Sequence, residues 1–454
     1  MKKAKYGEEA FSRRALIALI LPLIAEQFLA VLVGMADTVM VSGVGDSAVA
    51  AVSTVDTLNI LFINLFSAMS AGGAVVAAQY LGHGDRSSAC AAAKQLMLST
   101  ISLAMLVTAV IVLFHRPILG LMDDGHDIIT LNQSYTYLLI TAFSYPFLGI
   151  YNGGVGLLRA MGKSKASMYT SIAMNVINIG GNALLINLFG LGVTGAGIST
   201  LLSRIVSALV ILRIMFNDTM PIHLDSPLRQ KNYFRFDFDM IQRIFRVGVP
   251  NGLENSLFQV GKVLIMGIIT TFPTAIRAAN GICNSVSSVV NIPGSAIGLA
   301  TIAVIGQLIG ADKKEEAKRY GKKLIGFMYL AVLPLNLVLF FYAEPIVRLF
   351  SLSEAGIPVA AQIERVYAIC SILTWVPSFG LPNILRAAGD ARFTMGVSIV
   401  SMLILRLGAS YLLVYGFGLS LLGVWIAMHL DWIARGVCFV IRFCKNTWLD
   451  KKVI

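Results

Sequence analysis

Twelve apolar stretches, each long enough to cross a membrane, occupy most of this chain. A helix needs roughly 20 apolar residues to span the hydrocarbon core of a bilayer. Only 13% of the 454 residues are charged, whereas soluble proteins are about 25% charged. The sequence therefore predicts an all-α, polytopic membrane protein with twelve transmembrane helices. The expected spans are 15–41, 57–81, 95–114, 134–158, 168–189, 195–216, 247–271, 283–309, 324–342, 364–385, 394–415 and 419–441.

The positions of lysine and arginine predict how these helices are oriented, because basic residues beside the spans stay on the cytoplasmic side. If the N-terminal MKKAK is inside, 28 of the 36 basic residues lie in the tails and even-numbered connections or within four residues of them, and four lie in or directly next to the odd-numbered connections. We therefore expect both termini in the cytoplasm and the protein in the plasma membrane of a bacterium. The net charge of +12 follows largely from this asymmetry, so no nucleic-acid partner is expected.

The two halves of the chain repeat one another at an offset of 228 residues. LPLIAEQF at 21–28 aligns with VPNGLENS at 249–256, which places Glu26 over Glu254. One residue out of step, LLRAMG at 157–162 matches ILRAAG at 384–389. Because each half has an even number of spans, both enter the membrane in the same direction as parallel repeats.

This repeat predicts two lobes joined by a polar linker. We expect an N-lobe over 1–216, a cytoplasmic linker over 217–246 and a C-lobe with a cytoplasmic tail over 247–454. Two lobes of this kind suit alternating access, in which they rock around a site near the middle of the membrane.

Several segments together resemble the multidrug and toxic compound extrusion (MATE) family over nearly the whole chain. They are LPLIAEQF followed by GMADTVMV, AAQYLGHGD, LLRAMGKSKASM, NVINIGGNALLINLFGLGVTGAGIST and GVWIAMHLDWIARG. The resemblance implies a secondary active exporter, in which protons or sodium ions move inward while amphipathic, often cationic drugs or toxic metabolites move out. The family's cation site carries over onto Asp37, Asn178, Asn182 and Thr200, with Asn182 where some relatives have a second aspartate.

The residues support such a site independently of the resemblance. Asp37, Asn182 and Thr200 all fall in the outer half of the expected spans. Asn178 and Asn182 are four residues apart and share a helix face. Their oxygen atoms suit a hard cation such as sodium, and a desolvated carboxylate could instead bind a proton. Neighbouring helices also use such residues simply to hydrogen-bond one another, but an ionisable residue within the membrane is a functional candidate.

Glu26 and Glu254 occupy equivalent places, each four residues after a proline. They could face a central cavity with Gln27 and attract a cationic substrate. The alternative is that each carboxylate ties its helix to a neighbouring Asn, Gln or Arg.

Other functions find less support in the sequence. In GLLRAMGKS five residues separate the glycines, whereas a phosphate-binding loop needs four. No catalytic motif accompanies it, so we expect neither an enzyme nor a cofactor, and we expect a monomer. GHGDR leaves open a major-facilitator-type carrier, and a lipid-linked oligosaccharide flippase is the other alternative, although that class usually has fourteen helices.

Overall fold

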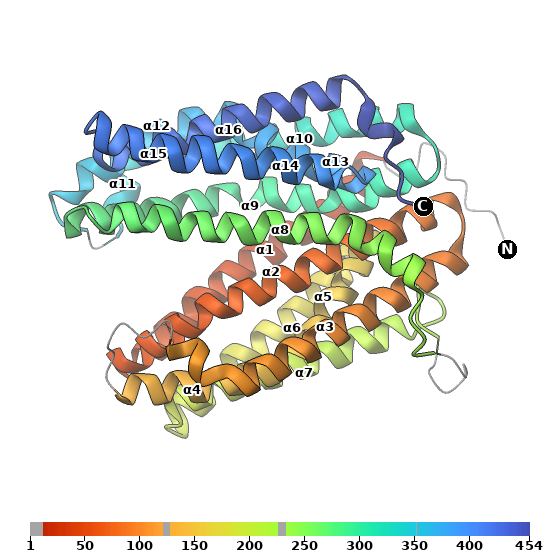
Figure 1. The fold of residues 1–454 in the computed structure, drawn as a ribbon, viewed down its shortest axis with the longest axis horizontal. Helices are drawn as coiled ribbons and strands as arrows, with labels where there is room; N and C mark the ends of the chain where they lie inside the picture. Colours follow the sequence, from red (N-terminus) through yellow and green to blue (C-terminus); the bar gives the residue numbers. More distant parts are fainter. Residues whose placement is uncertain (1–11, 121–127, 226–232, 351) are drawn as a thin grey trace. The chain divides into compact units, whose positions relative to one another are not determined.

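The computed structural model describes residues 12–120, 128–225, 233–350 and 352–454, and all regular structure within them is helical (Figure 1). Eleven helices in this part of the chain are long and apolar enough to span a membrane, and a bent pair makes up the twelfth. Each of the twelve predicted spans falls on one of these elements. The N-terminal MKKAK, used above to orient the chain, lies outside the described residues.

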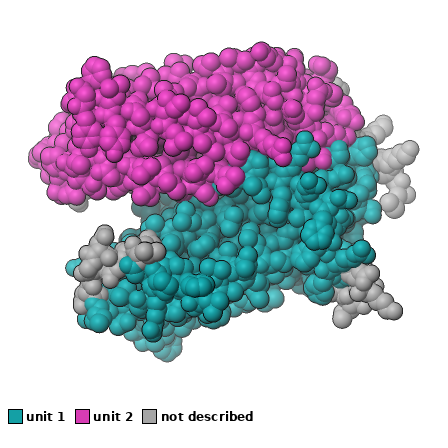
Figure 2. Space-filling model, in the orientation of Figure 1, with its two compact units in different colours: residues 1–252, 454 teal, residues 253–453 magenta. Residues whose placement is uncertain are grey.

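The chain divides into two compact units, residues 1–252 with 454 and residues 253–453 (Figure 2). In the first unit α1 packs against α6, α6 against α7, and α2 against α3 and α5. Its helices are α1 (Arg13–Ser42), α2 (Asp46–His83), α3 (Arg86–Gly120), α4 (Ile128–Phe143), α5 (Tyr145–Ala160), α6 (Ser164–Asn182), the short π-helix η1 (Ala183–Leu188) and α7 (Gly192–Met215). The first half of α8 (Phe238–Ile269) also belongs to this unit.

The fourth span is bent by 47° where α4 meets α5 at Ser144. Pro146 follows directly in the first turn of α5, and a proline has no N–H to donate to the carbonyl four residues earlier. That carbonyl, of Ala142, instead accepts a hydrogen bond from the Thr108 hydroxyl at 2.9 Å. The bend is therefore satisfied by a neighbouring helix, as the interior of a membrane requires.

In the second unit α9 packs against α10, α12 and α13, and α16 packs against α12, η3 and η4. Its elements after α8 are α9 (Thr274–Gly310), α10 (Lys314–Phe341), α11 (Ala343–Arg348), α12 (Gly356–Trp375), η3 (Val376–Gly380), α13 (Leu381–Ala388), α14 (Ala391–Ser401), η4 (Met402–Gly408), α15 (Ala409–Tyr411), η5 (Leu412–Gly416), α16 (Ser420–Cys444) and η6 (Thr447–Asp450). Trp448 of η6 is fully buried and stacks on Phe443 at 5.2 Å between ring centroids.

The predicted lobe boundaries differ from these units at the join, where the second unit begins at Leu253 rather than at residue 247. The linker was expected to run to residue 246, but α8 begins at Phe238 and continues without a break to Ile269. Residues 226–232 of the expected linker lie outside the described residues. The polar and basic residues at 239–246 thus form the first turns of a helix, where charged side chains can remain in water beside the membrane.

Candidate cation-binding site

Asp37 lies on α1 beside two asparagines of α6 in the first unit. The Asn182 amide nitrogen donates to Asp37 Oδ1 at 2.7 Å. Asn178, one turn earlier on α6, is oriented so that both its neighbours are satisfied: its nitrogen donates to Asp37 Oδ1 at 2.9 Å and its oxygen accepts from the Thr200 hydroxyl at 3.3 Å. The four residues predicted from the sequence thus form one continuous polar cluster.

The cluster depends on close packing between α6 and α7. The Ser199 hydroxyl donates to the main-chain oxygen of Asn178 at 2.7 Å. A Cβ atom at Gly181 would lie only 2.4 Å from that hydroxyl oxygen, so the missing side chain is what allows the approach. Asn178 and Asn182 are 7% and 2% exposed, and Asn182 Oδ1 has no hydrogen-bond partner within the described residues. One buried oxygen beside Asp37 is therefore available to coordinate a cation.

A second carboxylate, Asp56 of α2, lies close to this cluster. The Tyr137 side chain interacts with both Asp56 and Thr200, and Asp56 acts electrostatically on Asp37. Asn59 donates to Asp56 Oδ1 at 3.0 Å and accepts from the Tyr145 hydroxyl at 2.7 Å. Sequence reasoning missed Asp56, because the second span was drawn from residue 57 whereas α2 begins at Asp46.

Arg204 of α7 supplies the positive charge of this region. Its guanidinium donates to the Ser144 hydroxyl at 2.6 Å, at the bend between α4 and α5, and it acts electrostatically on both Asp37 and Asp56. Its partner could not be read from the sequence. One arginine thus faces two carboxylates, which leaves room for one more positive charge, such as a proton or a sodium ion.

Glu26 and Glu254 are each paired with an arginine of their own unit. Arg159 Nη2 donates to Glu26 Oε1 at 2.6 Å, and the Ser167 hydroxyl donates to Glu26 Oε2 at 2.8 Å. Arg386 Nη2 donates to Glu254 Oε1 at 2.6 Å. Both arginines belong to the LLRAMG and ILRAAG motifs, so the repeat extends to this ion pair.

This geometry matches the second reading of the two glutamates, in which each ties its helix to a neighbour. Gln27 follows Glu26 on α1 and is partly exposed. The role of all three residues in a substrate cavity remains a prediction.

Comparison with known proteins shows where the chain belongs. Residues 22–184 and 250–412 each match the family model described as MatE. The chain belongs to the MatE family. The two matched segments are offset by the same 228 residues that align Glu26 with Glu254, so the family model also recognises the repeat.

Relatives of this MatE chain are named as transporters. It is 26% identical to the uncharacterized transporter YisQ of Bacillus subtilis, over 99% of both chains. It is 24% identical to a probable multidrug resistance protein NorM of Thermotoga maritima, over 97% of this chain and 94% of the other. The crystal structure of MATE in the straight conformation shares its fold with a TM-score of 0.89, at 20% identity over 97% of each chain.

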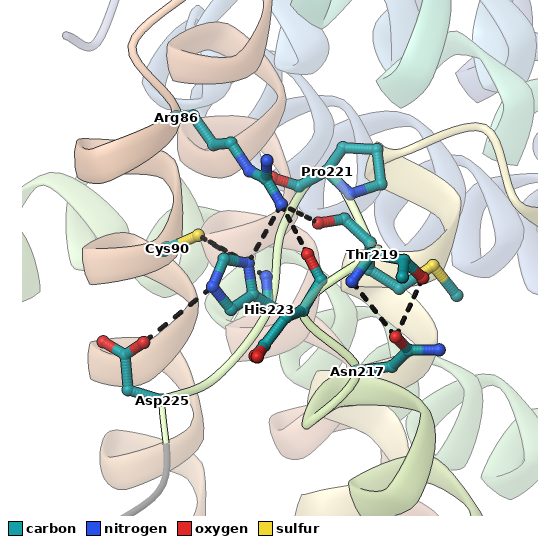
Figure 3. A network of polar contacts seen from close by, with 9 residues as sticks. Arg86, Cys90, Asn217, Thr219, Pro221, His223 and Asp225 are labelled. Carbon is teal, nitrogen blue, oxygen red and sulfur yellow. Dashed lines mark hydrogen bonds and ion pairs between the residues drawn. The ribbon is translucent and has the colours of Figure 1, made fainter. Parts of the chain in front are cut away.

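The segment that follows α7 in this MatE chain is held by Arg86 at the start of α3 (Figure 3). The Arg86 guanidinium donates to the main-chain oxygens of Asp218, Met220 and Pro221 at 2.9, 2.5 and 2.9 Å. His223 lies between Arg86 and Cys90, with Nδ1 3.6 Å from the Cys90 sulfur. These contacts engage Nε and Nη2 of Arg86, and we assign them to anchoring the segment.

Proposed function

We propose that this multi-pass membrane protein is a secondary active exporter, in which an inward flow of protons or sodium ions drives amphipathic small molecules out of the cell. Membership of the MatE family and relatives named as multidrug resistance proteins support the transport function. The coupling ion and the alternating-access mechanism are the parts of the proposal that go beyond these comparisons.

The observation that carries the proposal is the environment of Asp37. Within the described residues its hydrogen bonds come from the neutral amides of Asn178 and Asn182, and no cationic side chain is bonded directly to it. A carboxylate within a spanning helix is costly to keep ionised, and binding of a proton or a sodium ion would remove that cost. With Asn182 Oδ1 and Thr200 Oγ1 alongside, the oxygen donors also fit a sodium ion.

The available driving force is large enough for uphill export. Moving one charge through 100 mV is worth about 2.3 kcal/mol, which corresponds to roughly a fifty-fold concentration ratio. The carrier can use this energy only if the ion and the substrate favour different conformations, because a ligand with equal affinity for both shifts nothing. Asp37 meets the requirement if its amide partners rearrange when the ion binds.

We further propose that the protein lies in the bacterial plasma membrane with both termini in the cytoplasm and acts as a monomer. The 28-to-4 distribution of basic residues supports the orientation. That the exported compounds are often cationic stays a prediction from the resemblance.

Everted membrane vesicles that contain the protein test this function. We expect the aromatic cation ethidium to accumulate in the vesicles when either a proton gradient or a sodium gradient, outward from the vesicle interior, is imposed. The gradient that supports accumulation identifies the ion. If neither gradient raises uptake above that of vesicles without the protein, secondary active export of this dye is ruled out.

A further inference from the structure

The second unit contains a buried cluster of basic side chains. Arg435 of α16 and Arg406 of η4 both approach Asp431: Arg435 Nε lies 3.3 Å from Asp431 Oδ1, and Arg406 Nη1 lies 3.8 Å from Asp431 Oδ2. Arg435 is 2% exposed and Asp431 is fully buried. The Ser401 hydroxyl occupies Asp431 Oδ1 as well, at 2.6 Å.

This single carboxylate does not satisfy the two guanidinium groups. Arg406 Nε, Arg435 Nε and Arg435 Nη2 are buried and have no hydrogen-bond partner within the described residues. Asp431 lies within ion-pair distance of Arg435, but the Nε–H is not aligned to donate to it. Asp431 Oδ2 is also buried without a hydrogen-bond partner in the described residues, 3.8 Å from Arg406 Nη1. Unpaired buried donors are costly, and one spare carboxylate oxygen cannot accept from all three of them. The cluster therefore has room for a further acceptor.

A third cation, Lys262 of α8, adds to the imbalance. Lys262 interacts electrostatically with Arg406. Its side chain is exposed, and within the described residues no carboxylate lies within ion-pair distance of it. Glu254 acts on Arg435 only at longer range and is itself bonded to Arg386. Two arginines therefore share Asp431, and Lys262 adds a third positive charge beside Arg406.

Two aromatic rings lie against these cations. The Phe258 ring centroid is 4.9 Å from the Arg406 guanidinium carbon, 5.6 Å from that of Arg435 and 5.7 Å from Lys262 Nζ. The Phe379 ring centroid is 4.7 Å from the Arg435 guanidinium carbon. Stacking of this kind holds a guanidinium in place while leaving the N–H groups at its edge free to bind a ligand. The site is therefore both apolar and rich in donors.

The repeat shows that this polarity is specific to the second unit. Counting 228 residues onward from Asp37 leads to Ile265, and from Asn178 to Arg406. The second unit thus has Ile265 at the position of Asp37, and Arg406 lies within one residue of the position that aligns with Asn178. The same helix positions have acquired opposite electrostatic character.

We propose that Arg406, Arg435 and Lys262 bind the acidic group of an amphipathic aromatic compound. A carboxylate, sulfonate or phosphate would accept hydrogen bonds from the unpaired guanidinium edges, which suit planar and forked acceptors, while the aromatic part packs against Phe258. The proposal rests on the export function above and names anionic or zwitterionic compounds as its substrates, in addition to the cations that the resemblance implies.

A matched pair of probes tests the site directly. Naphthalene-1-sulfonate and 1-naphthylmethylammonium share an aromatic body and differ in charge. We would measure their binding by isothermal titration calorimetry to the full-length protein in nanodiscs of phosphatidylcholine, without any ion gradient. We expect the sulfonate to bind at least tenfold more tightly than the ammonium probe, because a difference of about tenfold is what one good charge-assisted hydrogen bond contributes. Equal affinity for the two probes would overturn the proposal.

Four variants assign the binding to these residues. Lys262→Gln and Arg406→Gln should each raise the Kd for the sulfonate by on the order of tenfold. Asp431→Asn removes the competing carboxylate and should lower that Kd. Arg442→Gln is the matched control, because Arg442 lies on the same helix as Arg435 but is fully paired with Asp390 at 2.7 Å. Unchanged sulfonate affinity in both Lys262→Gln and Arg406→Gln would show that the site lies elsewhere.

A purely structural role for the cluster predicts a different pattern. In that case Arg406→Gln and Asp431→Asn would both destabilise the protein. The Kd for the sulfonate would then not rise in the first variant and fall in the second. Lys262 is exposed, so its variant remains informative even if a buried arginine variant fails to fold. A loss of sulfonate binding in nanodiscs that contain phosphatidylglycerol would mean that a lipid headgroup is the occupant, and would overturn the assignment to an exported compound.

The binding assay also separates this inference from the export function. Asp37→Asn should still bind the sulfonate more tightly than the ammonium probe, because Asp37 belongs to the other unit and no gradient is used. If the sulfonate does not bind but gradient-driven uptake of ethidium persists, only the anion site is wrong. If the sulfonate binds and no gradient drives transport, the export proposal is wrong instead.

Discussion

Three carboxylates of the spanning helices differ sharply in what lies next to them. Glu26 and Glu254 each have an arginine nitrogen at 2.6 Å, so their negative charge is already balanced. Asp37 accepts hydrogen bonds from amide groups and interacts with Arg204 only electrostatically, at longer range. Because a carboxylate with neutral partners gains most from taking up a cation, our proposal assigns the coupling function to Asp37 rather than to the glutamates.

Asp37→Asn is expected to give a folded protein in the membrane that no longer exports against a gradient. Asparagine keeps the size of the side chain and part of its hydrogen bonding but cannot take up a proton or balance a sodium ion. Uptake of ethidium into everted vesicles, with each gradient imposed in turn, measures the loss. Wild-type uphill uptake with wild-type gradient dependence would move the coupling function to another carboxylate, and Asp56 would be the next candidate.

Asp56→Asn should weaken coupling without abolishing it. Asp56 and Asp37 share the positive charge of Arg204, so removing one carboxylate leaves Arg204 to act more strongly on the other and lowers the affinity of Asp37 for a cation. We expect the sodium or proton concentration that gives half-maximal uptake to rise, with the maximal rate retained. A half-maximal concentration equal to that of the wild type would show that Asp56 is not part of the site.

Substitutions at the contact between α6 and α7 test whether helix packing holds the candidate cation-binding site together. A methyl group at Gly181 would lie 2.4 Å from Ser199 Oγ, whereas nothing lies within 4 Å of the same position at Gly180. Gly181→Ala should therefore cost about 1–3 kcal/mol through overpacking and separate Asn178 from Thr200. Gly180→Ala should be neutral or stabilise by up to about 1 kcal/mol. Thermal unfolding of the purified variants measures both, and equal melting temperatures would contradict the packing argument.

The Glu26–Arg159 pair connects α1 to α5. Removing one partner should lower the free energy of unfolding. Glu26 is 4% exposed, so Glu26→Gln leaves Arg159 near the membrane interior without its counter-charge. Breaking a buried pair in this way costs about 3–5 kcal/mol. The double variant Glu26→Gln/Arg159→Gln should recover much of that loss, measured again by thermal unfolding. A double variant less stable than the single one would mean that the two side chains make independent contributions.

The sequence located the helices better than it located their partners. Hydropathy predicted all twelve spans, and the position of each residue along its helix placed Asp37 and Asn182 at a similar depth, where the structure brings them into contact. Arg204 and Ser144 are 60 residues apart and meet at the bend between α4 and α5, which hydropathy cannot reveal. Asp56 escaped notice because charged residues at the start of α2 look like part of a loop.

At the scale of the whole molecule, the predicted topology remains to be measured. Reporter fusions after Leu191 and Gly416 should report the outside, and fusions after Lys165 and Lys314 should report the cytoplasm. The expectation follows from the distribution of basic residues, which resist transfer across the membrane. Opposite results at any two of these four positions would contradict the predicted topology.

The two paired glutamates also affect how the chain can be synthesised. Arg159 lies 133 residues after Glu26, and Arg386 lies 132 residues after Glu254. Both α1 and α8 therefore leave the ribosome with an unpaired carboxylate. A charged residue near the centre of a helix costs about 2.5–3.5 kcal/mol on insertion by the translocon. The most apolar window of α1 has a mean hydropathy of 2.5, which offsets that cost, whereas that of α8 reaches only 1.2. We therefore expect α8 to be the late-inserting helix of the chain, retained beside the translocon until the helices after it, and finally Arg386, have been made.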